Sequence, residues 1–117
     1  MKFVHINIVV RDPDKSADFY KTYLMPEAAA VWLGDSLHLR DSSSDLAFQT
    51  GDPKSASGAH HGFVAESAKQ VDELVQRLQT NEVKVTDDCT EEGFRSVKFL
   101  DRDGYEVEVY WEDAWPH

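Results

Sequence analysis

The chain has 117 residues, a length that suits one domain with one modest hydrophobic core. Its formal net charge is −10, from 12 basic and 22 acidic residues, which argues against nucleic acid or an anionic membrane as a partner. The sequence contains no run of about 20 apolar residues, and its single cysteine, Cys89, excludes an internal disulfide and fits the reducing cytoplasm, where we expect the protein to act.

The first half of the sequence predicts a strand, a helix and three further strands. Residues 3–10 are apolar and β-branched, and Asp12 can cap a helix that carries Pro13 in its first turn. Pro26 closes that helix, because proline cannot continue it. Two short turns then divide residues 28–50 into three strands.

The second half predicts the same order of elements after a linker at residues 51–58. Residues 60–65 form a strand, and Ser67 with Gln70 makes a capping box that opens a helix. Asn81 stands where a left-handed residue would end this helix. The last three strands are expected at residues 83–85, 94–100 and 105–111.

The two halves match when His60 is laid on His5, a shift of 55 residues. The helix-opening residues and the apolar helix positions then coincide as well. One such unit cannot bury a core with two sides, so the sequence predicts a single α+β domain of two βαβββ repeats, residues 1–50 and 59–113.

Strand alternation places three residues that could bind a metal on the faces turned away from the helices. Val107 and Val109 should pack against a helix, which leaves Glu108 on the opposite face, and the same reasoning puts His5 and His60 on the open faces of their strands. Two histidines and a carboxylate are a donor set that binds one divalent metal with positions left open. We therefore expect a curved mixed sheet around a metal-binding cleft. Gln49 also points into this cleft, as the approximate counterpart of Glu108 in the first repeat.

Three stretches, HINIVVRDPDKSADFY, HHGFVAESAKQVDEL and FLDRDGYEVEVYWE, make the chain resemble the vicinal oxygen chelate superfamily, which includes glyoxalase I, methylmalonyl-CoA epimerase, extradiol dioxygenases and the fosfomycin and bleomycin resistance proteins. The superfamily's metal ligands match His5, His60 and Glu108. His61 is a rival for the second position, but it should face the helix. Gln49 is similar to the epimerase residue at its position, where glyoxalase I has a carboxylate.

This resemblance implies a glyoxalase-like enzyme of the lyase or isomerase type, in which a divalent ion (Zn, Ni, Mn, Co or Fe) chelates the oxygens of a small oxygenated substrate. Glu108 and Gln49 would be its catalytic residues. The resemblance also implies a homodimer in which His5 and Gln49 come from one chain and His60 and Glu108 from the other. The polar residues that could contact substrate are Asn7, His38, Arg40, Lys98 and Tyr110.

Two other interpretations stay open. A lone histidine on a strand is usually a half-buried polar residue, and an acidic excess is most often a solvated surface. The second functional class is a bleomycin-resistance-type protein that binds or sequesters a small molecule without catalysis, with Trp32, Tyr110 and Trp115 as candidates to line a hydrophobic groove. The presence of all three metal ligands favours the enzyme.

Overall fold

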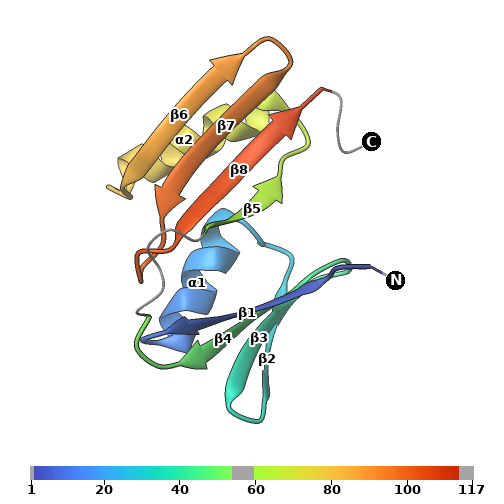
Figure 1. Ribbon diagram of the computed structural model, residues 1–117, viewed down its shortest axis with the longest axis vertical. Helices are drawn as coiled ribbons and strands as arrows, with labels where there is room; N and C mark the ends of the chain where they lie inside the picture. Colours follow the sequence, from blue (N-terminus) through green and yellow to red (C-terminus); the bar gives the residue numbers. More distant parts are fainter. Residues whose placement is uncertain (1, 54–59, 114–117) are drawn as a thin grey trace. The chain divides into compact units, whose positions relative to one another are not determined.

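The computed structural model describes residues 2–53 and 60–113, which fall into two compact units, Met1–Lys54 and Ser55–His117. Each unit contains one four-stranded sheet and one helix (Figure 1). Most of the expected linker at residues 51–58, and Trp115, lie outside the described residues. Within the described ranges, no helix is long and apolar enough to cross a membrane.

The first unit has the predicted order of strand, helix and three strands. In its sheet the strands follow the order β1-β4-β3-β2, and β1 pairs with β4 in parallel while the other pairs are antiparallel. The elements are β1 (His5–Val10), α1 (Pro13–Tyr23), β2 (Ala29–Leu33), β3 (Ser36–Arg40) and β4 (Asp45–Thr50).

The second unit repeats this topology. Its strands follow the order β5-β8-β7-β6, again with one parallel pair, β5 with β8. The elements are β5 (His60–Val64), α2 (Ala68–Thr80), β6 (Val85–Glu91), β7 (Phe94–Leu100) and β8 (Glu106–Glu112). Because β5 and α2 begin 55 residues after β1 and α1, the predicted duplication of two βαβββ units is confirmed.

In the first unit, helix α1 begins as the sequence predicts. The Asp12 carboxylate accepts a hydrogen bond from the backbone N–H of Lys15 (3.1 Å), and Pro13 occupies the first turn. Tyr20 of the helix is fully buried against Phe48 of β4, with ring centroids 5.3 Å apart. The helix therefore covers one face of the sheet and leaves the other face available for polar residues.

Helix α2 packs through the predicted stripe, whose members Val71, Leu74, Val75 and Leu78 are all buried. Ser67 caps it by accepting the N–H of Gln70, but the Gln70 side chain returns to the N–H of Glu66 (2.8 Å) rather than to that of Ser67. The capping box therefore has one of its two expected hydrogen bonds, and the second one goes to the residue before Ser67.

The prediction that Asn81 is the left-handed residue after α2 was wrong. Asn81 has φ −96°, and Glu82 adopts φ 58° instead. Backbone N–H groups of Glu82 and Val83 bond to the carbonyls of Gln79 and Leu78, which is the Schellman arrangement. Asn81 instead donates its side-chain amide to the carbonyl of Arg77 (2.7 Å), which ties it to the helix in a non-left-handed conformation.

Strand β6 also differs from the prediction of residues 83–85. It extends from Val85 to Glu91 through a polar run and pairs with β7 across the two-residue turn Glu92-Gly93. It is an edge strand of the sheet, and most of its side chains are exposed, so it lacks the apolar alternation on which the prediction relied.

Candidate functional site

In the second unit, His60 and Glu108 lie on the same face of the parallel pair β5 and β8. In the strand register, Glu108 pairs with Gly62, which lies two residues after His60. The His60 Nε2 atom is 3.9 Å from Glu108 Oε1, and the two side chains are 51% and 20% exposed. A Cβ atom at Gly62 would lie 3.4 Å from the Glu108 carbonyl oxygen. A side chain at Gly62 would therefore begin in contact with the β8 backbone at Glu108.

His61 points to the opposite face of β5, as the alternation predicts. Its ring is 6.3 Å from that of Phe63 and 6.4 Å from that of Tyr105, measured between centroids. Burial lowers the pKa of His61, and the nearby charge of Asp101 only partly opposes this effect. His61 is therefore a half-buried residue on the side of β5 away from Glu108, while His60 is the histidine on the face of Glu108.

Two of the predicted substrate residues flank Glu108. Lys98 of β7 is directly opposite Glu108 in the antiparallel register, so both side chains leave the same face of the sheet. Tyr110 follows two residues later on β8, and its ring stacks on that of Phe94 at 6.4 Å. Partial burial, together with the carboxylates of Glu112 and Glu108, raises the pKa of Tyr110, which keeps its phenol a hydrogen-bond donor.

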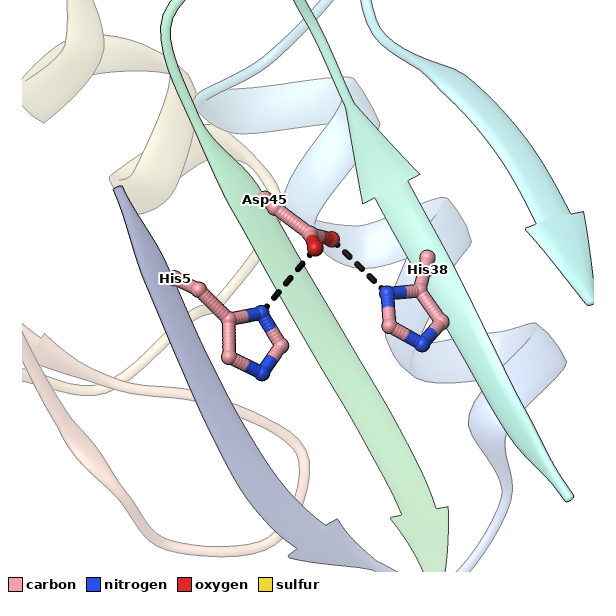
Figure 2. A group of neighbouring side chains, drawn as sticks. All are labelled: His5, His38 and Asp45. Carbon is pink, nitrogen blue, oxygen red and sulfur yellow. Dashed lines mark hydrogen bonds and ion pairs between the residues drawn. The ribbon is translucent and has the colours of Figure 1, made fainter. Parts of the chain in front are cut away.

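In the first unit, His5 lies in a cluster with His38 and Asp45, as Figure 2 shows. Asp45, the first residue of the central strand β4, is directly opposite His5 in the parallel register. One of its oxygens is 3.0 Å from His5 Nδ1, and the other is 2.9 Å from His38 Nδ1. The two imidazole rings are 5.8 Å apart and inclined by 16°, so they are nearly parallel.

Arg40, a predicted substrate contact, also binds this carboxylate. Its NH2 group is 3.3 Å from the Asp45 oxygen that faces His5. Burial alone would raise the pKa of Asp45, but the hydrogen bonds from His38 and Arg40, with their charges, outweigh it and lower that pKa. Asp45 is therefore an ionised carboxylate with three nitrogen donors around it.

Asn7 and Gln49 form a second polar contact on the same sheet. The Asn7 Nδ2 atom donates to Gln49 Oε1 over 3.1 Å, and both side chains belong to strands β1 and β4. The register corrects one expectation, because Gln49 is not the counterpart of Glu108. Gly62 pairs with Glu108, whereas Asn7, its counterpart in the first repeat, pairs with Ala47. The first unit thus has alanine where the second has a carboxylate.

Asp45 was missing from the residues inferred from sequence, although the information was available. His5 and Asp45 are the first residues of two strands that the repeat plan makes parallel neighbours. Pairing the strand starts would have placed the carboxylate beside the imidazole. His38 was expected only as a substrate contact, and the structure adds that its Nδ1 atom binds Asp45.

Each unit therefore offers imidazole nitrogen and carboxylate oxygen from neighbouring side chains. Neutral imidazole and carboxylate together suit zinc, nickel, manganese, cobalt and iron, whereas calcium and magnesium prefer oxygen ligands alone. His60 with Glu108 is the pair whose two donor atoms face one another without a hydrogen bond between them, since 3.9 Å is too long for one.

Comparison with known proteins agrees with the fold of the two units. The family model of the Glyoxalase/Bleomycin resistance protein/Dioxygenase superfamily matches residues 2–109. Among solved structures, the chain is similar to the fosfomycin resistance protein FosX from Listeria monocytogenes, complexed with Mn(II) and sulfate ion, with a TM-score of 0.79 and 19% identity over 95% of this chain and 90% of that one. It is also similar to lactoylglutathione lyase from Agrobacterium tumefaciens, with a TM-score of 0.76 and 20% identity over 99% and 97% of the two chains. The chain is similar as well to the oxidase ChaP-H2, with a TM-score of 0.79 and 17% identity over 96% of this chain and 94% of that one. At these identities the likeness shows the fold. A direct search of curated proteins finds no match.

Proposed function

Because the chain belongs to the Glyoxalase/Bleomycin resistance protein/Dioxygenase superfamily, we propose that it is a metal-dependent enzyme of the glyoxalase kind, a lyase or an isomerase, that acts on a small oxygenated molecule. His5, His60 and Glu108 would hold one divalent ion. The observation that carries the proposal is the His60–Glu108 pair, whose donor atoms are 3.9 Å apart on one face of the second unit.

The donor atoms of this pair fit a metal ion. Two ligand atoms that each lie about 2.1 Å from zinc can be at most about 4.2 Å apart, so 3.9 Å is compatible with one ion between them. Both side chains reach solvent, so an ion can enter. His5 is the matching residue of the first repeat, and its 47% exposed side chain can supply the third ligand. The manganese named for the FosX structure supports a divalent ion of this group.

When bound, such an ion would supply Lewis acidity toward substrate oxygens. The remaining work falls to side chains of the chain itself. The amide oxygen of Gln49 accepts a hydrogen bond from Asn7, and its NH2 group can donate to a substrate oxygen. Lys98 and Arg40 can bind a substrate anion through their positive charges. Tyr110 can donate its phenol proton in a hydrogen bond, because its raised pKa keeps that proton in place at neutral pH.

One observation favours the second candidate, a binding protein without catalysis. Strand β2 exposes Val31, Trp32 and Leu33 by 40%, 49% and 45%. Trp32 also lines an open hollow of about 440 Å³ in the first unit, together with Gln49. An aromatic side chain over an open hollow suits an aromatic or cationic ligand held without metal.

Metal content separates the two candidates. The protein should be purified without chelator, its metals measured by elemental analysis, and the metal-free form titrated with Zn²⁺ and Mn²⁺. We expect one ion per chain in the wild type and loss of stoichiometric binding in Glu108→Gln. Glu106→Gln is the matched control, because it removes the same charge two residues earlier on the same strand. Absence of metal from the wild type in both measurements would support the binding protein and contradict the enzyme.

We also propose that the protein is a homodimer whose sites each take ligands from two chains. A domain of this size gains buried apolar area by pairing, and its two sheets have β1, β2, β5 and β6 as edge strands. A mixture of His5→Ala and His60→Ala chains tests the proposal. In a shared site, half of the heterodimer sites keep all their ligands, so random mixing should restore about a quarter of the metal binding. A site closed within each chain would recover nothing on mixing, and a 13.3 kDa species in sedimentation would exclude the dimer.

A further inference from the structure

The cluster of His5, His38 and Asp45 carries an inference about which nitrogen of each histidine is available (Figure 2). Asp45 uses both carboxylate oxygens, one toward each imidazole, and both contacts go to Nδ1. An ionised carboxylate has no hydrogen to give, so each Nδ1 must carry the proton. In the neutral imidazole the lone pair then belongs to Nε2.

The geometry leaves both Nε2 atoms on the side away from the carboxylate. The rings are nearly parallel, at 16°, and both turn Nδ1 toward Asp45, so the second nitrogens point in similar directions, as Figure 2 shows. The side chains of Asp45 and His38 are only 18% and 13% exposed, whereas that of His5 is 47% exposed. The contact with Asp45 therefore holds one end of the His5 ring, and the other end reaches solvent.

We propose that Asp45 is a positioning residue that fixes His5 and His38 in the tautomer with the proton on Nδ1, and that it thereby presents Nε2 of His5 as the metal-binding atom. The part that concerns the metal rests on the proposed function, whereas the tautomers do not. A carboxylate that accepts the other N–H of a ligand histidine orients the ring and increases its basicity. By the repeat register, Asp45 corresponds to Glu106 and not to the proposed ligand Glu108.

A different use of the same residues is a metal ion held by the two Nδ1 atoms and Asp45 itself, since each residue has a donor atom within 4.8 Å of a donor atom of the other two. Arg40 opposes that use. Its guanidinium is 3.3 Å from the Asp45 oxygen that faces His5, and a divalent cation on this carboxylate would be repelled by it. The hydrogen-bonded arrangement therefore suits Nε2 coordination better than Nδ1 coordination.

The tautomers can be read directly from long-range ¹H–¹⁵N correlation spectra of the metal-free protein at neutral pH, with the signals assigned through His5→Gln and His38→Gln. We expect both rings of the wild type to show the proton on Nδ1, although the Nε2–H form is the commoner one for neutral histidine in water. In Asp45→Asn the amide offers one acceptor oxygen and one NH2 donor, so at most one ring can keep the Nδ1–H form. Asp45→Ala should release both rings.

Zinc titration supplies the second measurement. Loss of a carboxylate behind a ligand histidine should weaken zinc binding by about 10- to 100-fold in Asp45→Asn. Asp18→Asn is the control, because it removes the same charge from an exposed position on α1, and its affinity should not change. On addition of zinc to the wild type, Nε2 should be the His5 nitrogen whose shift responds.

The result that would overturn the proposal is a wild-type spectrum with the proton on Nε2 of His5, and this measurement requires no variant to fold. Unchanged tautomers and affinity in Asp45→Asn, or a zinc response at Nδ1 of His5, would also contradict it. If the wild type binds no zinc but shows both Nδ1–H tautomers, the proposed metal enzyme fails while the positioning of the two rings by Asp45 stands.

Discussion

Replacing His60 or His61 by alanine should separate metal binding from stability, because the two adjacent residues face opposite sides of β5. The His60 side chain is 51% exposed, so its removal should change the free energy of unfolding of the metal-free protein by no more than about 0.5 kcal/mol. His61 is packed near the rings of Phe63 and Tyr105. Its removal should cost about 1–2 kcal/mol, which lowers Tm by roughly 4–8 °C per kcal/mol in a small domain.

Zinc should stabilise His61→Ala as it stabilises the wild type, but it should not stabilise His60→Ala. At a free zinc concentration 100 times Kd, binding to the folded state alone adds about 2.7 kcal/mol to stability. His61→Ala should keep this increment. In His60→Ala, once Kd exceeds the zinc concentration tenfold, the increment falls to about 0.1 kcal/mol or less.

Urea unfolding of each variant with zinc and with chelator measures both quantities. The wild type supplies the reference increment, and a monovalent salt of the same ionic strength controls for general charge screening. Loss of the zinc increment in His61→Ala with its retention in His60→Ala would reverse the assignment. An equal response of the two variants would show that neither histidine is a specific ligand.

Three further predictions follow from particular groups. Metal occupancy should fall as pH drops toward the histidine range, because neutral imidazole is the ligand, and constant occupancy down to pH ~5 in a dialysis measurement would indicate a site of carboxylates alone. Glu82→Gly should raise the unfolding free energy by about 1 kcal/mol, because Glu82 has φ 58° and glycine adopts this conformation without strain, and a lower Tm would refute this reasoning. The Ser43 N–H, with further bonds from Ser44, lowers the pKa of Asp41 below 3.8 against the effect of partial burial. The stability that ionised Asp41 contributes is thus present above pH 3.8 and lost as pH falls through its folded-state pKa, so the advantage of the wild type over Asp41→Asn in urea unfolding should shrink there and not grow.

The regular elements were predictable where apolar residues follow one period. The stripe of α2 has helical spacing, and all four of its members are buried. Strand β6 could not be found in this way, because its run Asp87-Asp88 is exposed at the edge of the sheet and follows no apolar alternation. The end of α2 was misplaced for a different reason. Asn81 satisfies a helix carbonyl with its side chain, so the left-handed conformation moves to Glu82, a residue that local preference alone would not select.

The candidate site was predictable only in part, because face and strand follow from the sequence while register does not. Alternation placed His60 and Glu108 on one face, and the structure brings their donor atoms to 3.9 Å. The counterpart of Glu108 in the first repeat depends on how β1 and β4 are aligned, and a difference of two residues changes it from Gln49 to Ala47. The same alignment brings Asp45 beside His5, because these two residues begin the paired strands β1 and β4.

The repeats therefore differ at two positions of the strand that pairs with the histidine strand. These are residues 45 and 47 in the first repeat and residues 106 and 108 in the second. The second unit has Glu108 facing His60, and its other carboxylate, Glu106, accepts a hydrogen bond from Thr86 (3.0 Å). The first unit has Ala47 at the position of Glu108, and its carboxylate is Asp45, in contact with His5 Nδ1. Under the proposed function, one repeat would supply two ligands, and the other would supply one ligand with the residue that orients it. Three ligands on a divalent ion leave positions open for a substrate, whereas a carboxylate at position 47 would add a fourth donor from the first repeat.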